Sequence, residues 1–351
     1  MAAKILKGAE QNSRNKLKSE KPLVYEKIIK YDEKFARGEV IPIVDIQYDY
    51  TCNLRCKHCS NLSFEKKDTV LTPEVLKDFA DQMDVLGLAQ LGISGGEPLL
   101  FKDLEDALMA IGPERFHIFI STNGMFLTPE KAMRLKSLGL DKVKISIDSM
   151  DAELHDANRD KKGVYSKAME ALFNAKNAGL AVVAQHCVTH QSVRTENTER
   201  LAEFCQENGF ALDIMIARAI GKWEGNHDVL IDDDDAAHLR ELHQKYPVLF
   251  RDTYPSYGMD RGCGTVRNIL SLTKYGDVLP CVFIHVSLGN IFEEPLKDII
   301  ERGLSIKHFH SYNPLCLSGE DRNFINNYMS RFYGKSLPIS WKEAFTDEDF
   351  I

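Results

Sequence analysis

Three cysteines, Cys52, Cys56 and Cys59, lie close together at C-x3-C-x2-C spacing. A structural zinc site uses four protein ligands, and an iron–sulfur cube held by protein alone usually uses four thiolates. Three thiolates therefore leave one metal position open to a cofactor or a substrate. A zinc site with His58 as the fourth ligand is an alternative at this point, although His58 stands between two of the cysteines and is poorly placed to close the same site.

A second short motif, Gly95-Gly96-Glu97-Pro98, follows further along the chain. Two glycines allow the backbone to approach a ligand closely, and the Glu97 carboxylate could pair with a cationic amine. Taken alone, the motif is better explained by a tight turn that carries a surface glutamate.

The elements that must position these residues alternate between strand and helix patterns from about residue 43. Six strand–helix units imply a parallel sheet with right-handed crossovers, and six are too few for a closed eight-stranded barrel. We therefore expect the α/β class with a curved, partly open barrel. The expected strands are 43–49, 89–94, 116–121, 141–148, 180–188 and 210–217, and the expected helices are 73–87, one from about 102, 128–139, 165–179 and 195–209.

The segments that follow the expected strands hold the unusual residues. The cysteine loop follows the first strand, and the glycine–glutamate motif follows the second. The fourth strand ends at Ser146 and Asp148. Because the carboxyl ends of parallel barrel strands meet on one face, these segments are expected to converge at one mouth.

Bulk composition limits the remaining possibilities. The chain has 351 residues, 44% hydrophobic and 27% charged, with a formal net charge of −8, which gives no sign of a nucleic-acid partner. No apolar run has the length of a membrane span, and the first residues lack a signal-peptide core. Eight cysteines without a secretion signal are read as thiols or metal ligands in a reducing compartment, so we expect a cytoplasmic protein without a membrane or nucleic-acid partner.

The expected domain organisation follows from where these patterns change. The basic residues 1–21 are read as a loosely held tail, and residues 22–38 as helical. Residues 320–333 are read as a final helix. The expected divisions are 1–42 for the N-terminal tail and helix, 43–230 for the partial barrel, 231–257 for a connecting helical segment, 258–318 for a small separate α+β domain and 319–351 for a C-terminal helix and tail.

Together, the C-x3-C-x2-C loop after the first strand and the Gly95–Pro98 motif after the second resemble the radical S-adenosylmethionine (SAM) superfamily, over about residues 43–217. The resemblance implies a partial (β/α)6 barrel. It also implies a [4Fe–4S] cluster on Cys52, Cys56 and Cys59, whose open iron binds SAM, and a 5′-deoxyadenosyl radical that takes hydrogen from a substrate.

The resemblance also implies which residues contact SAM. Gly95 and Gly96 would line its amino group, and Glu97 would accept hydrogen bonds from that group. The stretch "HDANR" resembles a sequence common in peptide-modifying members, which makes Arg159 a candidate partner of the SAM carboxylate; the alternative is a surface salt bridge. The other residues implied are His58 near the adenine, and Ser146 and Asp148 near the ribose.

A later set of cysteines, Cys263, Cys281 and Cys316, resembles the opening of the SPASM/twitch extension of many radical SAM enzymes. With only three cysteines, the shorter twitch form is expected, with one auxiliary [4Fe–4S] cluster. Structural cysteines in an iron-free domain are the alternative.

The sequence thus predicts a radical SAM oxidoreductase or epimerase. A peptide is the first expectation for its substrate, an aminosugar or nucleotide-type molecule the second, and a flavodoxin or ferredoxin the expected one-electron donor. Cys187, if it points into the barrel, could donate a hydrogen atom to a substrate radical; burial as a small apolar side chain is the alternative. From a different class, a zinc-stabilised binding module without redox chemistry also remains open.

Overall fold

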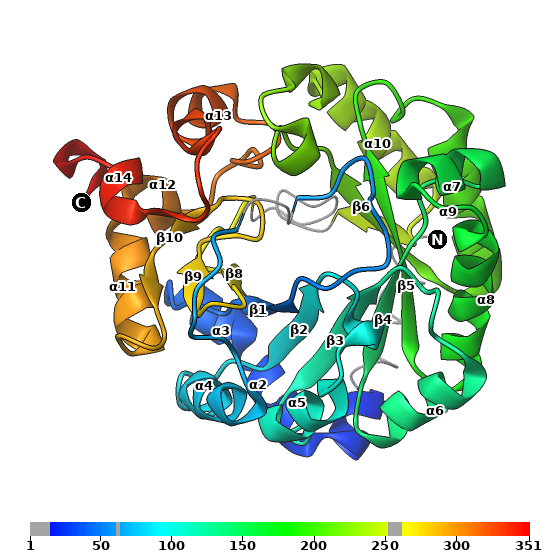
Figure 1. Cartoon of the computed structure of the whole chain (residues 1–351), viewed down its shortest axis with the longest axis horizontal. Coiled ribbons are helices and arrows are strands. Elements are labelled where there is room, and N and C mark those ends of the chain that lie inside the picture. The colour runs from blue at the N-terminus through cyan, green and yellow to red at the C-terminus, as the bar shows by residue number, and fades with distance from the viewer. Residues whose placement is uncertain (1–14, 61–63, 252–261) are drawn as a thin grey trace.

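The computed structural model describes residues 15–60, 64–251 and 262–351, and its centre is one ten-stranded curved sheet (Figure 1). The strands of this sheet are β1 (Ile43–Asp49), β2 (Gln90–Gly95), β3 (His117–Thr122), β4 (Lys142–Ser146), β5 (Ala181–Val188), β6 (Ala211–Ile216), β7 (Leu249–Arg251), β8 (Ile269–Leu272), β9 (Asp277–Leu279) and β11 (Gly289–Asn290). Their order is β11-β9-β8-β1-β2-β3-β4-β5-β6-β7. β7 and β8 do not pair in the described part of the chain, so the barrel stays open there.

The strands from β8 through β1 to β7 all run parallel, as right-handed crossover units require. Helices cover the outer face of the sheet (Figure 1). Several begin with a side-chain cap, for example Thr72, whose hydroxyl accepts a hydrogen bond from the Val75 amide. The helices of this region are α4 (Pro73–Val85), α5 (Leu104–Ile111), α6 (Pro129–Ser137), α7 (Ala152–Arg159), α8 (Val164–Asn177), α9 (Glu196–Asn208) and α10 (Asp233–Lys245).

The predicted partial barrel is confirmed, and each of its six expected strands lies within about two residues of the observed one. Their outward side chains form the main apolar core with the helices. The connecting segment, expected to be helical only, also contains β7, which pairs with β6.

The C-terminal region, expected from the sequence to be a small separate domain, contributes strands to the sheet of the barrel. β8 pairs in parallel with β1, and Ile269 through Leu272 lie opposite Ile43 through Ile46. The reason is physical: the apolar residues of β8 find their partner on the open edge of the barrel, which also removes that edge from solvent. The proposed boundaries of this region remain a prediction.

The rest of the C-terminal region consists of short elements. Residues 320–333 form α13 (Arg322–Asn327) and a 3-10 turn, η4 (Met329–Phe332), and further elements follow them, so the expected final helix is neither continuous nor last. The others are α11 (Leu296–Ser305), α12 (Lys307–His310), α14 (Trp341–Ala344), η5 (Asp347–Asp349) and the two-stranded sheet of β10 (Val286–Ser287) and β12 (Ile339–Ser340).

The N-terminal segment is anchored where it meets the barrel. Lys21 is buried, and its ammonium donates to the carbonyl oxygens of Phe116 and Gly139 and pairs with Asp141 at 2.5 Å. The expectation of a loosely held tail is therefore wrong at this end, and its first fourteen residues lie outside the described part of the chain. Two helices, α2 (Pro22–Ile28) and α3 (Tyr31–Ala36), replace the single expected one. Among the described residues, no helix combines the length and apolar character needed to cross a membrane.

Candidate active site

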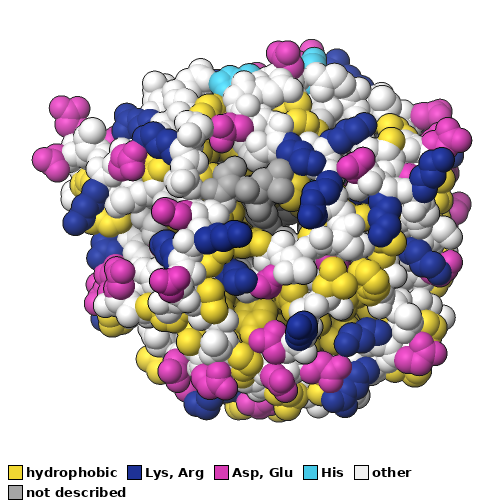
Figure 2. Space-filling model, viewed as in Figure 1, with side chains coloured by type: hydrophobic (Ala, Val, Ile, Leu, Met, Phe, Trp, Pro, Cys, Tyr) yellow, Lys and Arg dark blue, Asp and Glu magenta, His cyan; other side chains and the backbone are white. Residues whose placement is uncertain are grey.

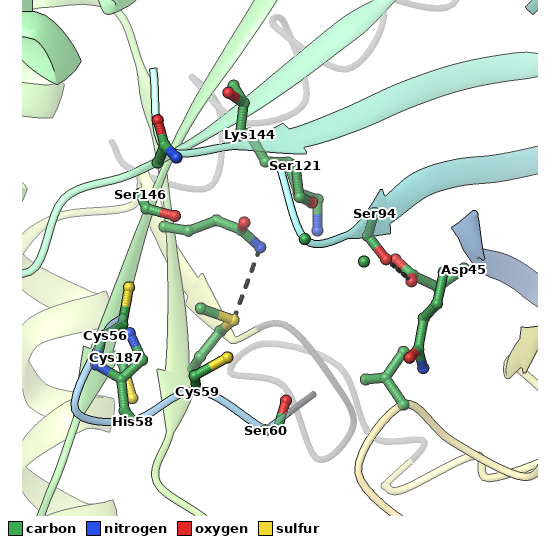
Figure 3. A pocket seen from close by; sticks show the side chains of 18 of the residues that line it. Asp45, Cys56, His58, Cys59, Ser60, Ser94, Ser121, Lys144, Ser146 and Cys187 are labelled. Atoms are coloured by element: carbon green, nitrogen blue, oxygen red, sulfur yellow. Dashed lines mark hydrogen bonds between the residues drawn. The ribbon is translucent and has the colours of Figure 1, made fainter. Parts of the chain in front are cut away.

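A cavity of about 730 Å³ occupies the interior of the barrel and extends to the loops at the carboxyl ends of the strands. Figure 3 shows side chains of the cysteine loop and of β5 on one side and Asp45 with Ser94 on the other. The cavity gathers most of the residues expected to converge: Cys52, Cys56, His58, Cys59, Gly95, Gly96, Glu97, Ser146, Arg159 and Cys187. Asp148 is not among its lining residues.

The three cysteines of the first loop are partly exposed and all face this cavity. Burial raises the pKa of the Cys52 and Cys56 thiols, and the Arg159 guanidinium acts against this at Cys56, where Nη1 lies 3.8 Å from Sγ. An arginine beside one of three thiols favours its thiolate form, which is the form that binds a metal.

The spacing of these thiols does not fit a single zinc ion. The sulfur atoms of Cys52, Cys56 and Cys59 do not all lie within 4.8 Å of one another. A tetrahedral zinc with Zn–S bonds near 2.3 Å would hold its sulfurs about 3.8 Å apart. A cluster binds each thiolate at a different iron and accepts a wider spacing, so the donor set fits an iron–sulfur cluster better.

The two glycines after β2 are also required by the cysteine loop, a role that the sequence did not indicate. A Cβ on Gly95 would lie 2.2 Å from the Asp49 carbonyl oxygen, and one on Gly96 would lie 2.1 Å from that of Thr51. The amides of Gly96 and Glu97 donate to these same oxygens at 2.7 and 2.8 Å. The glycines therefore let two neighbouring loops dock against each other, in addition to lining the cavity.

The side chain of Glu97 is fully buried. The alternative of a tight turn that carries a surface glutamate is therefore wrong. Its carboxylate accepts hydrogen bonds from the Thr122 hydroxyl at 2.6 Å and from the Asn123 and Leu99 amides at 2.8 and 3.1 Å. Burial outweighs these bonds and raises the pKa of Glu97. The carboxylate thus ties the loop after β2 to the loop after β3, at the wall of the cavity.

Arg159 forms a buried ion pair, not the surface salt bridge considered from sequence. Its Nη2 lies 2.6 Å from Asp148 Oδ1, and both residues are less than a tenth exposed. Burial alone would raise the pKa of Asp148, but Arg159, followed by His58, holds it well below its usual range. His58 Nε2 lies 4.0 Å from the same oxygen, and burial lowers the pKa of His58 to about 4. Asp148 therefore stands behind Arg159 and positions it.

The second set of cysteines is buried beside the barrel. Cys263 bridges to Asn313, which brings the loop of Cys316 next to it, and Cys281 follows β9. A hydrogen bond shared with Cys263, helped by the guanidinium of Arg218, lowers the pKa of the Cys316 thiol; Arg218 Nη2 lies 4.0 Å from Cys316 Sγ. These three sulfurs also do not all lie within 4.8 Å, so they too do not fit one zinc ion.

Comparison with known proteins decides the family. The model of the radical SAM superfamily matches residues 48–207, and that of the SPASM iron–sulfur cluster-binding domain matches residues 263–318. The mycofactocin maturase MftC of Mycolicibacterium smegmatis is 30% identical over 285 residues, which cover 75% of this chain and 70% of that protein. This chain belongs to the radical SAM superfamily. Its members need a [4Fe–4S] cluster and SAM, and a SPASM domain implies an auxiliary iron–sulfur cluster, as expected from the sequence.

Other relatives agree on the fold of this radical SAM protein. An AdoMet-dependent heme synthase of Nitratidesulfovibrio vulgaris is 24% identical over 322 residues, 82% of this chain and 86% of that protein. Streptococcus suis SuiB bound to its precursor peptide SuiA has a TM-score of 0.60 at 18% identity, covering 79% of this chain and 69% of SuiB. The anSMEcpe structure with bound AdoMet has a TM-score of 0.58 at 19% identity, covering 74% and 80%.

A clamp on the third cysteine of the radical SAM loop escaped sequence analysis. The turn η2 (Gly221–Trp223) follows β6, and the Lys222 amide donates to the Cys59 carbonyl oxygen at 3.1 Å. Gly221 has φ +59°, and a Cβ there would lie 2.2 Å from that oxygen. Trp223 lines the cavity, with its ring centroid 5.8 Å from that of His58. In the sequence, Gly221 was the one residue whose type could have indicated this contact.

Cys187 faces the cavity from β5, where it lies opposite Met215 of β6. The alternative of simple burial is thus excluded, since the side chain is partly exposed at the cavity wall. Its role stays a proposal.

Polar residues deeper in the barrel were also missed. Lys144 of β4 pairs with the fully buried Asp213 of β6 at 2.9 Å, and Gln185 donates to the same carboxylate at 3.3 Å. The signal was available, because Lys142 and Lys144 alternate along β4 with Ser146, which the sequence already placed at the mouth.

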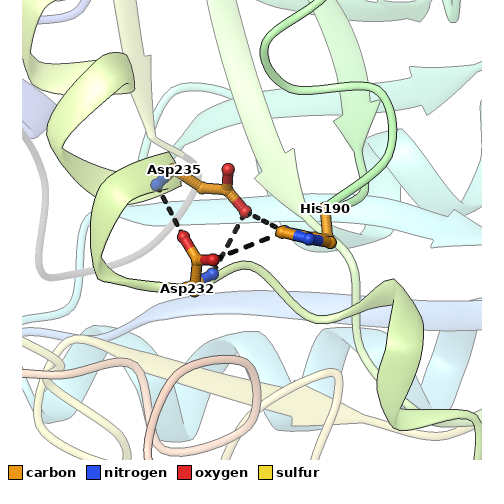
Figure 4. Close-up of side chains that lie close together, drawn as sticks. All are labelled: His190, Asp232 and Asp235. Carbon is orange, nitrogen blue, oxygen red and sulfur yellow. Dashed lines mark hydrogen bonds and ion pairs between the residues drawn. The ribbon is translucent and has the colours of Figure 1, made fainter.

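One further cluster, outside the barrel, has ligand-type side chains but a structural role. His190, Asp232 and Asp235 lie together (Figure 4), with His190 Nδ1 2.6 Å from Asp235. Asp232 and Asp235 form the capping box of α10, and Arg194 Nε donates to Asp235 at 2.6 Å. Since the carboxylates already cap a helix and pair with an arginine, this group is a helix cap and not a metal centre.

Proposed function

We propose that this protein modifies a peptide by radical SAM chemistry, in the cytoplasm and with a flavodoxin or ferredoxin as its electron donor. The observation that carries the proposal is the large cavity that joins the cysteine loop, the glycine–glutamate motif and Cys187. Kinship with the mycofactocin maturase MftC, and a fold shared with SuiB, which was solved with its precursor peptide, support a peptide over a small molecule.

The residues proposed to hold the cofactors are those at the mouth of the cavity. Cys52, Cys56 and Cys59 would bind the SAM cluster, and Cys263, Cys281 and Cys316 one auxiliary cluster. When bound, the first cluster supplies the electron that cleaves SAM to methionine and the 5′-deoxyadenosyl radical, which takes a hydrogen atom from the substrate.

The side chains around the cavity are proposed to bind SAM and to orient it. We assign Arg159 to the SAM carboxylate, with Asp148 holding its guanidinium in place from behind; Asp148 is thereby moved from ribose contact to positioning. Ser146 at the end of β4 remains assigned to the ribose, and His58 with Trp223 to the adenine. Glu97 keeps a lone pair of its carboxylate for the SAM amino group while it fixes the neighbouring loop. Gly95 and Gly96 leave room for that amino group.

Cys187 is proposed to return a hydrogen atom in an epimerisation. Its S–H bond breaks, a C–H bond forms on the substrate radical, and a thiyl radical remains on sulfur. One electron from the external donor and one proton from solvent restore the thiol. If Cys187 does not react, the substrate radical would lose one electron, which the auxiliary cluster could accept, and one proton to solvent, which would give the oxidoreductase outcome instead.

The test is anaerobic reconstitution followed by iron analysis and SAM cleavage. We expect about eight irons per chain, falling to about four when Cys52, Cys56 and Cys59 are all replaced by alanine, as two cubane clusters require. The wild type, with dithionite as reductant, should release 5′-deoxyadenosine, and the variant should not. Iron-free protein, or SAM cleavage that persists in the variant, would disprove the assignment.

A further inference from the structure

The inner face of β4 carries cationic groups from the floor of the cavity toward its mouth. Lys142, Lys144 and Ser146 are alternate residues of this strand, so their side chains share one face, and all three line the cavity. At a rise of about 3.3 Å per residue, Lys142 lies about 13 Å below Ser146. An extended peptide would cover this depth with about four residues.

The two lysines differ in their partners. Lys144 pairs with Asp213, as described above. The side chain of Lys142 makes no hydrogen bond or ion pair within residues 15–60, 64–251 and 262–351, whereas its backbone pairs with Phe119 and Ala181 of the neighbouring strands. Its ammonium lies 5.8 Å from the ring centroid of Phe119, which also lines the cavity. Burial, followed by the charge of Lys144, lowers the pKa of Lys142 to about 8, so the ammonium remains the main form at neutral pH. The charges of Asp213 and Asp141 act on this ammonium only from beyond ion-pair distance, so a bound anion would lower the cost of its burial.

The balance of charge in the cavity points the same way. Its described lining holds Arg55, Lys142, Lys144, Arg159 and Arg218 against only two carboxylates, Asp45 and Glu97. Asp148 and Asp213 lie directly behind two of these cations and offset them. Some positive charge remains, in a chain whose formal net charge is −8. Figure 2 shows basic side chains around the hollow on this face of the molecule. Such a field attracts anions into the cavity.

We propose that Lys142 binds a carboxylate of the substrate at the floor of the barrel, with the Phe119 ring beside it. This inference rests on the proposed peptide substrate and adds a requirement to it: the peptide carries a carboxylate about four residues from the carbon that loses hydrogen. That carboxylate comes either from a free C-terminus or from an acidic side chain.

The test measures a 13C-methyl signal of Lys142 itself and does not depend on turnover. Lysines of the reconstituted, SAM-bound enzyme are reductively methylated with [13C]formaldehyde, which keeps their charge, and the Lys142 signal is assigned by its absence in Lys142→Arg. Three probes are titrated: N-acetyl-Gly-Phe with a free carboxylate, the same peptide as its C-terminal amide, and N-acetyl-Gly-Glu-Phe-amide. Calorimetry then gives Kd for the unmethylated wild type, Lys142→Met, Lys142→Arg and Lys167→Met, a control at an exposed ion pair of α8.

We expect a carboxylate probe, and not the amide, to move the Lys142 signal. Lys142→Met should raise its Kd at least tenfold, whereas Lys142→Arg and Lys167→Met should leave it within about threefold. A response to the first probe alone identifies a C-terminal carboxylate, to the third alone an acidic side chain, and to both a carboxylate from either source. If no carboxylate probe moves the signal, or the amide moves it equally, the inference is wrong. Peptide modification is measured separately, by mass spectrometry, so either idea can fail without the other.

Discussion

The ion pair between Asp148 and Arg159 allows a quantitative prediction. The two charges are 2.6 Å apart, and their side chains are 1% and 8% exposed. Removing one partner of a buried pair typically costs about 3–5 kcal/mol, because the other charge is left without compensation. We therefore expect Asp148→Asn to lower the free energy of unfolding by about that amount, and to weaken SAM binding because Arg159 loses the group that positions it.

The assay is urea unfolding of the cluster-free protein, followed by circular dichroism, for the wild type, Asp148→Asn, Asp148→Leu, Arg159→Met and the double variant Asp148→Leu with Arg159→Met. Since apolar replacement of both partners is often close to neutral, the double variant should recover most of the loss. The folded-state pKa of Asp148 is depressed, so its contribution is present above the unfolded pKa of about 4 and is lost as the pH falls below it. The difference between wild type and Asp148→Asn should therefore shrink on acidification.

Two results would refute this reasoning. One is a loss of less than about 1 kcal/mol in Asp148→Asn at neutral pH, which would mean that the pair is solvated in solution. The other is a double variant as unstable as the sum of its single changes, which would mean that the two side chains act independently.

Three further predictions concern the cavity. Gly96→Ala places a methyl group against the Thr51 carbonyl oxygen and should displace the cysteine loop, so that reconstituted iron falls by about half; unchanged iron would contradict the docking role of this glycine. Cys187→Ala should still cleave SAM but incorporate no deuterium into the substrate from D2O, with Cys205→Ala as a control, and persistent incorporation would rule out Cys187 as donor. Burial raises the pKa of Asp45 to about 6, so its ionisation opposes folding as the pH rises from about 4 to 6. Asp45→Asn should therefore be more stable than wild type at pH 8, by about 1–3 kcal/mol, with the gain absent near pH 4 in urea unfolding; an equal gain at both pH values would exclude the titration.

Much of the fold could be predicted from sequence, because the buried parallel strands are short apolar runs separated by amphipathic helices. The convergence of the loops on one face could be predicted from the parallel topology alone. The pairing of β8 with β1 could not be predicted, since it joins residues more than two hundred positions apart and leaves no local pattern.

The site was predicted in outline and less well in detail. The cysteine set and the Gly95–Glu97 motif each lie within a few consecutive residues, so both can be recognised in the sequence. Whether Glu97 is buried, which loop needs Gly96, and which partner Arg159 takes depend on packing between separate loops. The lysines of β4 were overlooked because charged residues are expected outside a barrel, and only the register reveals that they point inward.

The pairing of β8 with β1 also constrains how this chain is made. β1 ends just before the first cysteine of the loop, yet its outer neighbour is synthesised only after most of the chain has emerged from the ribosome. Until then, β1 presents an unpaired apolar edge, which is a template for association with other chains. Long-range parallel pairing of this kind is slow to form and exposed to aggregation. A truncation before residue 269 would make that transient edge permanent, so we expect the barrel to aggregate when it is expressed without its C-terminal region.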